Sequence, residues 1–576
     1  MKEMNIINPA CVHEMFDGEH EFCIPDYQRA YSWEKDTQVK QFIDDIDEMV
    51  TYGDSKPYYI GHFLLEYDEQ TPEKYYIIDG QQRLTTVVIF MRCVYNELKK
   101  REEQSPSTFE DFGVDIENIY KTYISTISGV YKLSTVSSDN PFFERFVYKN
   151  QDVKPGEIRS QRYITDAVQT FEKVLACADD QQIKSWYLCL SNATISTHIV
   201  KDKFQATQIF AFQNDRGKSL SELEKLKAEI MHKVYTFATN NKLALNAIGY
   251  IRQLFTEIFC LTEKLKTRED EVLHYHSYAF YGYDKDMIQN MRRGLKSHQR
   301  NEIEFLKDFT AELLQSYNTM LQIESCYNMQ SSSVAEVQLL DKYHSTPLLF
   351  KLYYYHSGNN DIIEKCASLM EKILFKMEYR YDDFRTNSMI TIAHNYSGDK
   401  EQLLKDLEHI SHRGFKDYWD FDGSCGKYFT DNKFHYKSSI KYVLWKYENH
   451  LREQKRERLL SASEYANEFG NKQKETTLDH ITPQNPNFTT YSEDFIRDYL
   501  NNIGNLSPMG WGNNASKSNL NPADEDVREY YKTTYLSMQE IYETLVQDGV
   551  WGEKQIDERR KRIFEFVNKM YDLSIQ

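Results

Sequence analysis

The sequence predicts a mainly α-helical protein with a small α/β core at its N-terminal end. Proline (12) and glycine (22) are scarce among the 576 residues, which disfavours turn-rich sandwiches and barrels. Strand-like apolar runs occur within the first hundred residues, whereas residues 116–379 follow helical periodicity almost throughout. We therefore expect one small sheet followed by a long helical region.

The α/β core is predicted from two strands and the helix that follows them. The runs YYIGHFLLEYD and KYYIID are typical of buried strands, and the second run ends at Asp79. Gly80 then allows a tight turn before a long amphipathic helix that contains LTTVVIFMRCVYNELKKREE. A strand, a glycine turn and a helix in this order direct backbone N–H groups at an anion.

Composition limits the class of protein. The net charge of −18 disfavours a broadly basic surface and predicts weak nonspecific binding to DNA at physiological salt. The nine cysteines form no CxxC pair, which indicates reduced thiols rather than a disulfide framework or a zinc site. No apolar run reaches the roughly 18 residues of a membrane span, and the N-terminus lacks a signal peptide. We expect a cytoplasmic protein without a membrane partner. The length predicts two to four domains, and the pattern along the chain divides it into 1–235, 236–400 and 401–576.

The most specific motif is TTLDHITPQNP followed by NNIGNLSPMGWGNNASKSNL. It contains Asp479, His480, Asn505, Asn514 and Lys517. A short strand places Asp479 and His480 on opposite faces, and a helix after the loop can return Asn514 to the same place. In the alternative interpretation the Asp-His pair is a helix cap and the asparagines are turn formers, but the order of the whole motif disfavours it.

The residue types in this motif fit the hydrolysis of a phosphodiester. Carboxylate and amide oxygens are hard ligands that suit Mg²⁺. An imidazole can take a proton from water near neutral pH, and one metal ion can stabilise the phosphate and the leaving 3′ oxygen. Lys517 is expected to contact a neighbouring DNA phosphate.

The segment resembles the HNH (ββα-metal) nuclease family through DHITPQN, GNL and NNASKSN. The resemblance implies that His480 is the general base, that Asp479 and Asn514 hold Mg²⁺ or Mn²⁺, and that Asn505 orients His480. The last position is Asn rather than the His that names the family, and Asn513 is an alternative register for it.

Four further motifs resemble the N-terminal domain of the GmrSD modification-dependent (type IV) restriction enzymes: IPDYQRAYSW, YYIGHFLLE, YYIIDGQQRLTT and FQNDRGKSLSELEKLKA. The resemblance covers about residues 8–235 and, through the nuclease segment, about 430–525. It implies a ParB/sulfiredoxin-like core that binds and hydrolyses a nucleotide, GTP or ATP. DRGKS is not a Walker A loop, because Phe212 stands where that motif needs glycine.

A nucleotide site is expected around the DGQQR motif. Asp79 suits a metal ion or a polarised water, Gly80 permits close approach of a phosphate, and Arg83 offers a bidentate fork to phosphate oxygens. Taken singly, these residues favour structural roles, with Arg83 paired to Asp79 and with Tyr27 and Trp33 as core aromatics. The four motifs in order favour the nucleotide site instead. The expected nucleotide-binding residues are Tyr27, Gln28, Arg29, Asp79, Gly80, Gln81, Gln82, Arg83, Thr85, Asn214 and Gly217.

Together these motifs predict a Mg²⁺-dependent HNH DNA endonuclease that is regulated by an N-terminal NTPase and restricts foreign, modified phage DNA. Two alternatives stay open. One is a nicking or toxin-type nuclease whose N-terminal domain senses a ligand without turnover, and the other is a nucleotide-binding scaffold with an inactive nuclease site. The sequence leaves open the DNA trigger, the effect of the nucleotide, and whether the chain forms a homo-oligomer.

Overall fold

The computed structural model divides the chain into two compact units. The N-terminal unit comprises Met1–Leu273 and Asp286–Asn318, and the C-terminal unit comprises His274–Lys285 and Thr319–Gln576. The expected connecting region 236–400 is thus shared between the units, and the division into three domains stays a prediction. The structure describes residues 9–52, 58–67, 71, 73–105, 113–156, 158–200, 221–282, 284–297, 301–378, 388–415, 421–430, 440–468 and 476–573.

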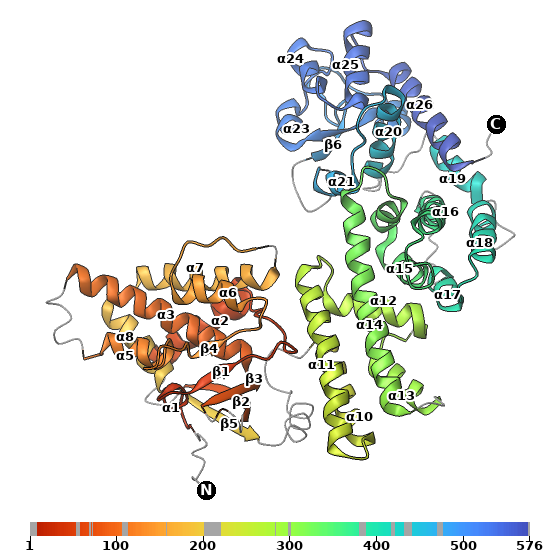
Figure 1. The fold of residues 1–576 in the computed structure, drawn as a ribbon. Coiled ribbons are helices and arrows are strands. Elements are labelled where there is room, and N and C mark those ends of the chain that lie inside the picture. Colours follow the sequence, from red (N-terminus) through yellow and green to blue (C-terminus); the bar gives the residue numbers. More distant parts are fainter. Residues whose placement is uncertain are drawn as a thin grey trace. The chain divides into compact units, whose positions relative to one another are not determined.

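A five-stranded mixed sheet forms the centre of the N-terminal unit, in the order β4-β1-β3-β2-β5 (Figure 1). Its central strands β2 and β3 are the two predicted strands, and they pair antiparallel with Leu65 opposite Ile77. The other three pairings are parallel. The strands are β1 (Glu21–Cys23), β2 (Tyr59–Tyr67), β3 (Lys74–Asp79), β4 (Leu133–Ser134) and β5 (Thr194–Val200).

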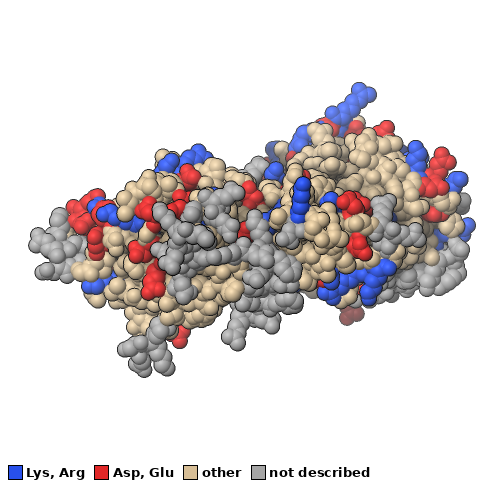
Figure 2. Space-filling model, turned by 60° about the horizontal axis from the view of Figure 1, so that its bottom comes forward, with Lys and Arg blue, Asp and Glu red and all other residues tan. Residues whose placement is uncertain are grey.

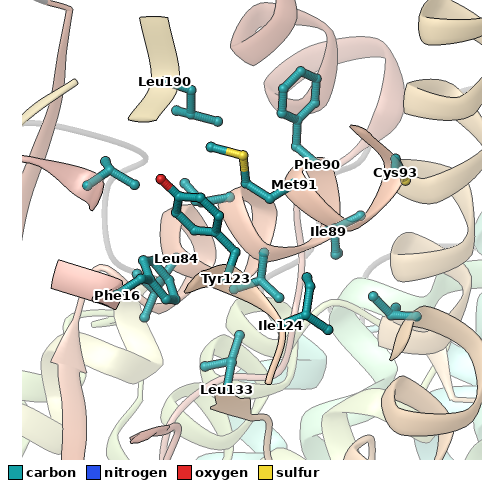
Figure 3. Packing of buried hydrophobic residues seen from close by; sticks show 14 of the residues in the cluster. Phe16, Leu84, Ile89, Phe90, Met91, Cys93, Tyr123, Ile124, Leu133 and Leu190 are labelled. Atoms are coloured by element: carbon teal, nitrogen blue, oxygen red, sulfur yellow. The ribbon is translucent and has the colours of Figure 1, made fainter. Parts of the chain in front are cut away.

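Helices α2, α3 and α7 lie on one side of this sheet (Figure 1). In the core between them, Tyr123 of α5 points into a group of apolar side chains that includes Phe16, Leu84 and Leu133 (Figure 3). On the other face of the sheet, Leu64 and Ile78 pack with Ala228 of α10. Both faces of β2 and β3 are therefore covered, which explains their nearly continuous apolar sequence.

The remaining elements of the N-terminal unit are helical. Two of them, α12 and α14, continue into the C-terminal unit. The helices are α1 (Val12–Phe16), η1 (Lys35–Val39), α2 (Lys40–Tyr52), α3 (Gln81–Gln104), α5 (Ile116–Tyr123), α6 (Asn140–Phe143), η2 (Glu144–Tyr148), α7 (Arg159–Cys177), α8 (Asp180–Ser191), α10 (Glu222–Phe237), α11 (Asn241–Lys264), α12 (Glu269–Tyr281), α13 (Met287–Ser297) and α14 (Glu302–Ser325).

The C-terminal unit is helical apart from one antiparallel pair, β6 (Thr476–His480) and β7 (Leu506–Gly510), in the part of the chain that the structure describes. Helix α23 follows β7 directly. The helices are η3 (Cys326–Asn328), α15 (Ser333–Tyr355), α16 (Asn360–Glu378), α17 (Ser388–Asn395), α18 (Lys400–Arg413), α19 (Phe421–Thr430), α20 (Ile440–Lys455), α21 (Ala462–Glu468), α22 (Glu493–Asp498), η4 (Ile503–Asn505), α23 (Trp511–Lys517), α24 (Glu525–Arg528), η5 (Glu529–Tyr531), α25 (Leu536–Asp548) and α26 (Glu553–Tyr571).

The expected fold class is confirmed at the level of a mainly helical chain with a small mixed sheet. One expectation is wrong in detail, because β4 and β5 interrupt the region 116–379 that was predicted to be helical. All nine cysteines are free thiols, as expected. Within the described ranges we find no helix with the length and apolar character needed to span a bilayer.

Candidate functional site

The strand–strand–helix segment of the C-terminal unit holds the predicted nuclease residues. Asp479 and His480 are the last two residues of β6, which pair with Ser507 and Leu506 of β7. Because side chains alternate along a strand, Asp479 and His480 point to opposite faces, as expected. Asp479 is 2% exposed, whereas the imidazole of His480 is half-buried.

The carboxylate of Asp479 has a partner on each oxygen. Its Oδ1 lies 2.8 Å from Nζ of Lys517, and its Oδ2 accepts a hydrogen bond of 2.5 Å from the hydroxyl of Tyr531. Lys517 and Tyr531 are both fully buried. No pattern in the sequence pointed to Tyr531, which follows Asp479 by 52 residues.

Lys517 was expected to contact a DNA phosphate, and the structure places it elsewhere. Its amine is buried and donates both to Asp479 and to the backbone carbonyl of His480, at 2.6 Å. An amine enclosed in this way does not face solvent, so the expected phosphate contact does not fit the observed geometry.

His480 is held at its Nε2 atom. This nitrogen lies 2.9 Å from Oδ1 of Asn501 and 3.4 Å from Nε2 of Gln484. A carbonyl oxygen as the closer partner favours the tautomer in which Nε2 carries the proton. Burial lowers the pKa of His480 below its ordinary value, and the hydrogen bond that the imidazole donates to Asn501 offsets this in part. The imidazole is therefore neutral near pH 7, the form that can accept a proton.

Asn505 acts on the backbone that follows His480. It is fully buried, and its Nδ2 donates to the carbonyls of Thr482 (3.1 Å) and Leu500 (2.9 Å). The N–H of Thr482 donates back to Oδ1 of Asn505 at 2.8 Å. These contacts fix the chain two residues beyond the imidazole, so Asn505 positions His480 through the backbone.

The turn that carries Asn505 is itself held by α26. Nη1 of Arg559 donates to the carbonyls of Ile503, Gly504 and Leu506, and Arg559 is fully buried. A Cβ atom at Gly504 would lie 2.0 Å from the carbonyl oxygen of Ile556. The close approach of α26 to this turn therefore requires glycine at position 504.

Asn514 and Asp479 were expected to hold a metal ion together. Asn514 is half-buried, and its Nδ2 donates to the hydroxyl of Thr477 at 2.6 Å. Both oxygens of Asp479 are already engaged in the core, so the pair does not fit a divalent cation in this arrangement. Across the ranges the structure describes, no group of three or more His, Cys, Asp or Glu residues is arranged to hold one.

In the N-terminal unit, the IPDYQRAYSW and YYIIDGQQRLTT motifs bind each other. The side chain of Gln82 donates to the carbonyl of Ala30 (2.9 Å) and accepts from the N–H of Ser32 (2.8 Å). The side chain of Gln28 donates to the carbonyl of Ile78 at 2.9 Å. Two of the expected nucleotide-binding residues, Gln28 and Gln82, thus join the two motifs into one structure.

The turn between β3 and α3 has the predicted geometry. Gly80 has φ +96°, a left-handed conformation that favours glycine, and α3 begins at Gln81. Arg83 lies in the first turn of α3, and its guanidinium lies 3.8 Å from the carboxylate of Asp79. Burial raises the pKa of Asp79, and Arg83 counteracts that rise.

The polar side chains at the start of α3 differ in what they offer to a ligand. Gln81 is buried, and the hydroxyl of Thr85 donates to the carbonyl of Gln81 at 2.8 Å. The hydroxyl of Thr86 likewise lies 2.8 Å from the carbonyl of Gln82. The side chain of Arg83, in contrast, is 23% exposed, and its Nη1 donates to the carbonyl of Ile60 at 3.4 Å.

Helices α10, α11 and α12 complete this site. The amine of Lys227 on α10 donates to the carbonyl of Tyr27 at 2.9 Å, and Arg252 lies 4.4 Å from the centre of the Tyr27 ring. Arg29 pairs with Glu269 at 3.5 Å. Sequence reasoning missed Lys227, whose burial lowers its pKa to about 8.

The remaining expected residues, Asn214 and Gly217, lie outside the described residues. The helix that follows them is described, and Ser221 caps it. The hydroxyl of Ser221 accepts from the N–H of Glu224, and the carboxylate of Glu224 accepts from the N–H of Ser221.

Charges on the surface are mixed. Lysine and arginine side chains are interspersed with aspartate and glutamate over the face that Figure 2 shows.

Comparison with known families gives two matches, while comparison with curated proteins found no match. Residues 12–231 match the model of the N-terminal domain of the GmrSD restriction endonuclease. Residues 419–566 match the model of the C-terminal domain of GmrSD restriction endonucleases. The two matches occur in the same order as the two groups of motifs and together cover more than half of the chain, which therefore belongs to the GmrSD restriction endonuclease family.

Proposed function

We propose that this restriction endonuclease is an HNH-type enzyme that cleaves modified phage DNA in the cytoplasm under the control of a nucleotide bound to its N-terminal unit. The observation that carries the proposal is the state of His480. Its imidazole is half-buried, held by Asn501 at 2.9 Å, and has a lowered pKa. A neutral imidazole fixed at the end of a strand is suited to general-base catalysis.

The proposed chemistry is the hydrolysis of one phosphodiester bond. With the proton on Nε2, the acceptor nitrogen of His480 is Nδ1, which takes a proton from a water molecule. The water oxygen forms a bond to phosphorus, the bond from phosphorus to the 3′ oxygen breaks, and that oxygen takes a proton from solvent. Asn505 contributes by fixing the backbone at Thr482, and it need not touch the substrate.

Dependence on Mg²⁺ or Mn²⁺ is a separate expectation from the family resemblance. EDTA tests it directly, because cleavage that persists in EDTA removes the expectation. The engaged oxygens of Asp479 do not support this carboxylate as the ligand.

For the N-terminal unit we propose binding of GTP or ATP at the joined PDYQR and DGQQR motifs. The turn at Gly80, the N-terminus of α3 and the exposed part of Arg83 support phosphate binding. Lys227 and Arg252 add positive charge around Tyr27. One observation favours the alternative of sensing without turnover: Asp79, the candidate for holding a metal ion or water, already lies 3.8 Å from Arg83.

The decisive experiment compares cleavage of plain and modified plasmid DNA by the parent chain and by His480→Ala, with and without each nucleotide. Loss of a general base typically lowers the rate by about 10²–10⁴-fold. The control is His409→Ala, which removes an exposed histidine of α18. Cleavage at the parent rate by a folded His480→Ala chain contradicts the proposed base, and nucleotide hydrolysis by that same chain shows that the N-terminal unit is intact.

A further inference from the structure

We propose that Asp479 is a positioning residue that fixes β6 to α23 and η5 through Lys517 and Tyr531, and that it is not a metal ligand of the nuclease. The inference rests on the proposed nuclease function and deepens it. It departs from the role that the family resemblance implies for this position.

The first argument is that both oxygens of the Asp479 carboxylate already have partners. Oδ1 of Asp479 is paired with Lys517 at 2.8 Å, and Oδ2 accepts from Tyr531 at 2.5 Å. Burial and the neighbouring Asp479 raise the pKa of the Tyr531 phenol well above its ordinary value, so Tyr531 stays protonated and donates. Neither oxygen is left facing an open side where a hydrated cation binds.

The second argument is the direction in which the side chain of Asp479 points. Asp479 is 2% exposed and Tyr531 belongs to a core cluster with Met509 and Ile541. A DNA phosphate and any ion bound to it approach from solvent. The side chain of Asp479 points into the core, while the neighbouring His480 points to the opposite, half-buried face of the strand.

The third argument is the contact between the Asp479–Lys517 ion pair and the backbone of His480, the proposed base. Lys517 Nζ bridges the carboxylate of Asp479 and the backbone carbonyl of His480, at 2.8 and 2.6 Å. Lys517 is the last residue of α23, so the bridge ties the end of this helix to the backbone of the proposed base. Asp479 holds the amine in place, and the amine holds the carbonyl of His480.

This arrangement makes a prediction that a metal ligand does not. If Asp479 acts inside the core through its ion pair with Lys517, removing either partner leaves a buried charge without its counter-charge, and removing both relieves that part of the penalty. If Asp479 binds the metal, replacing it abolishes cleavage whatever stands at position 517. The neutral pair D479N/K517M separates the two roles.

The experiment uses the full chain and compares D479N, K517M and D479N/K517M with the parent. It measures the melting temperature, the cleavage rate of supercoiled plasmid, and the Mn²⁺ concentration that gives half-maximal cleavage. We expect K517M to lose at least about 100-fold in rate and the double variant to recover at least about tenfold of that loss, with an unchanged Mn²⁺ requirement. A folded double variant without recovery, or one that needs more than tenfold more Mn²⁺, overturns the proposal.

Tyr531→Phe keeps the test decisive if the double variant does not fold. This change removes one hydroxyl and leaves the ion pair, so we expect a rate loss of about tenfold with an unchanged Mn²⁺ requirement. Tyr542→Phe is the matched control, because its hydroxyl binds the exposed Glu529 at 2.9 Å. If Tyr531→Phe raises the Mn²⁺ requirement or leaves the rate at that of the control, the proposal is overturned.

His480→Ala is included to separate this inference from the proposed function. If the parent does not cleave, or if His480→Ala cleaves like the parent, the nuclease assignment fails. In that case the melting temperatures still test the ion pair. A higher melting temperature of the double variant than of the single variants supports the structural link between Asp479 and Lys517. If the decreases in melting temperature of the single variants add up in the double variant, the link is overturned.

Discussion

The side chain of Asn505 binds the backbone of Thr482 on both of its polar groups. The N–H of Thr482 donates to Oδ1 of Asn505 at 2.8 Å, and Nδ2 of Asn505 donates to the carbonyl of Thr482 at 3.1 Å. A buried amide that matches one backbone unit in this way sets the path of the chain just after His480. A shift of the backbone at Thr482 would displace the imidazole of His480 without changing the imidazole itself.

Asn505→Ala is therefore expected to lower both stability and cleavage. It leaves the N–H of Thr482 and the carbonyl of Leu500 buried without this partner, at a cost of about 2–4 kcal/mol in the free energy of unfolding. Urea denaturation measures that cost, and single-turnover cleavage measures the rate.

Two further variants sharpen this test. Asn505→Asp is expected to be at least as damaging as alanine, because a second carboxylate oxygen would face the carbonyls of Thr482 and Leu500. Asn513→Ala removes an exposed asparagine of α23 and should stay within about 0.5 kcal/mol of the parent. Equal stability of Asn505→Ala and Asn513→Ala contradicts the role of Asn505.

The pH dependence of cleavage should reflect the lowered pKa of His480. Burial disfavours the charged imidazole, so the neutral form persists below pH 6.5, the ordinary pKa of histidine. The cleavage rate is expected to stay level down to about that pH and to fall below it, with a midpoint lower than 6.5. Single-turnover rates measured with circular dichroism at each pH distinguish loss of catalysis from unfolding.

The same shift has a consequence for stability. Below the ordinary pKa the unfolded chain binds a proton that the folded His480 resists, so the contribution of this group destabilises the fold as the pH falls. His480→Ala should remove this part of the acid sensitivity. An acid limb of cleavage with a midpoint above 6.5 is incompatible with the environment described for His480.

Gly61→Ala is expected to disable the nucleotide site by displacing Arg83. A Cβ atom at Gly61 would lie 1.6 Å from Nη1 of Arg83, and Gly61 has φ +129°. We expect at least about a tenfold loss of nucleotide affinity in a titration, since one charge-assisted contact contributes about 1.5–3 kcal/mol.

Gly129→Ala provides the matched control for that substitution. Gly129 also has a positive φ, +84°, but nothing lies within 4 Å of its added Cβ. Both variants carry the strain of alanine in a left-handed conformation, roughly 1–2 kcal/mol, and only Gly61→Ala moves Arg83. If the two variants bind nucleotide equally well, the position of Arg83 does not matter for binding.

The elements that could be predicted are those with a local signature. The strands at Tyr59–Tyr67 and Lys74–Asp79 are apolar runs, and Gly80 marks the turn between strand and helix. Strand β5 was missed because its sequence, TISTHIV, mixes polar and apolar residues and gives no continuous apolar run.

The contacts that could not be predicted join residues far apart in the chain. Spacing identified Asp479 and Lys517 as polar members of one motif, but only the packing of α23 on β6 shows that they pair in the core. Tyr531 and Lys227 could not be found from local sequence, because a single hydrogen bond to a distant carboxylate or carbonyl produces no repeating pattern of residues. Lysine is also expected at the surface, which hides a buried Lys227 from composition-based reasoning.

The last prediction concerns the coupling of nucleotide and DNA. Arg83 belongs to the N-terminal unit and His480 to the C-terminal unit, while Arg29 of the PDYQR motif pairs with Glu269 at the start of α12, a helix that continues from one unit into the other. If nucleotide binding prefers one arrangement of such helices, it changes the affinity for DNA, and linkage requires DNA to change the affinity for nucleotide by the same factor. Arg83→Ala should therefore lose nucleotide hydrolysis and also alter DNA cleavage, in either direction.

The measurement pairs hydrolysis and cleavage assays with nucleotide titrations in the presence and absence of DNA. Lys100→Ala, which removes an exposed cation from the same helix α3, is the control and should change neither activity. Reciprocal shifts in the two affinities of the parent, both lost in Arg83→Ala, support coupling, because a ligand can move an equilibrium only by its difference in affinity for the two states. If Arg83→Ala abolishes hydrolysis but leaves the cleavage rate, the trigger dependence and the DNA affinity unchanged, the two units work independently.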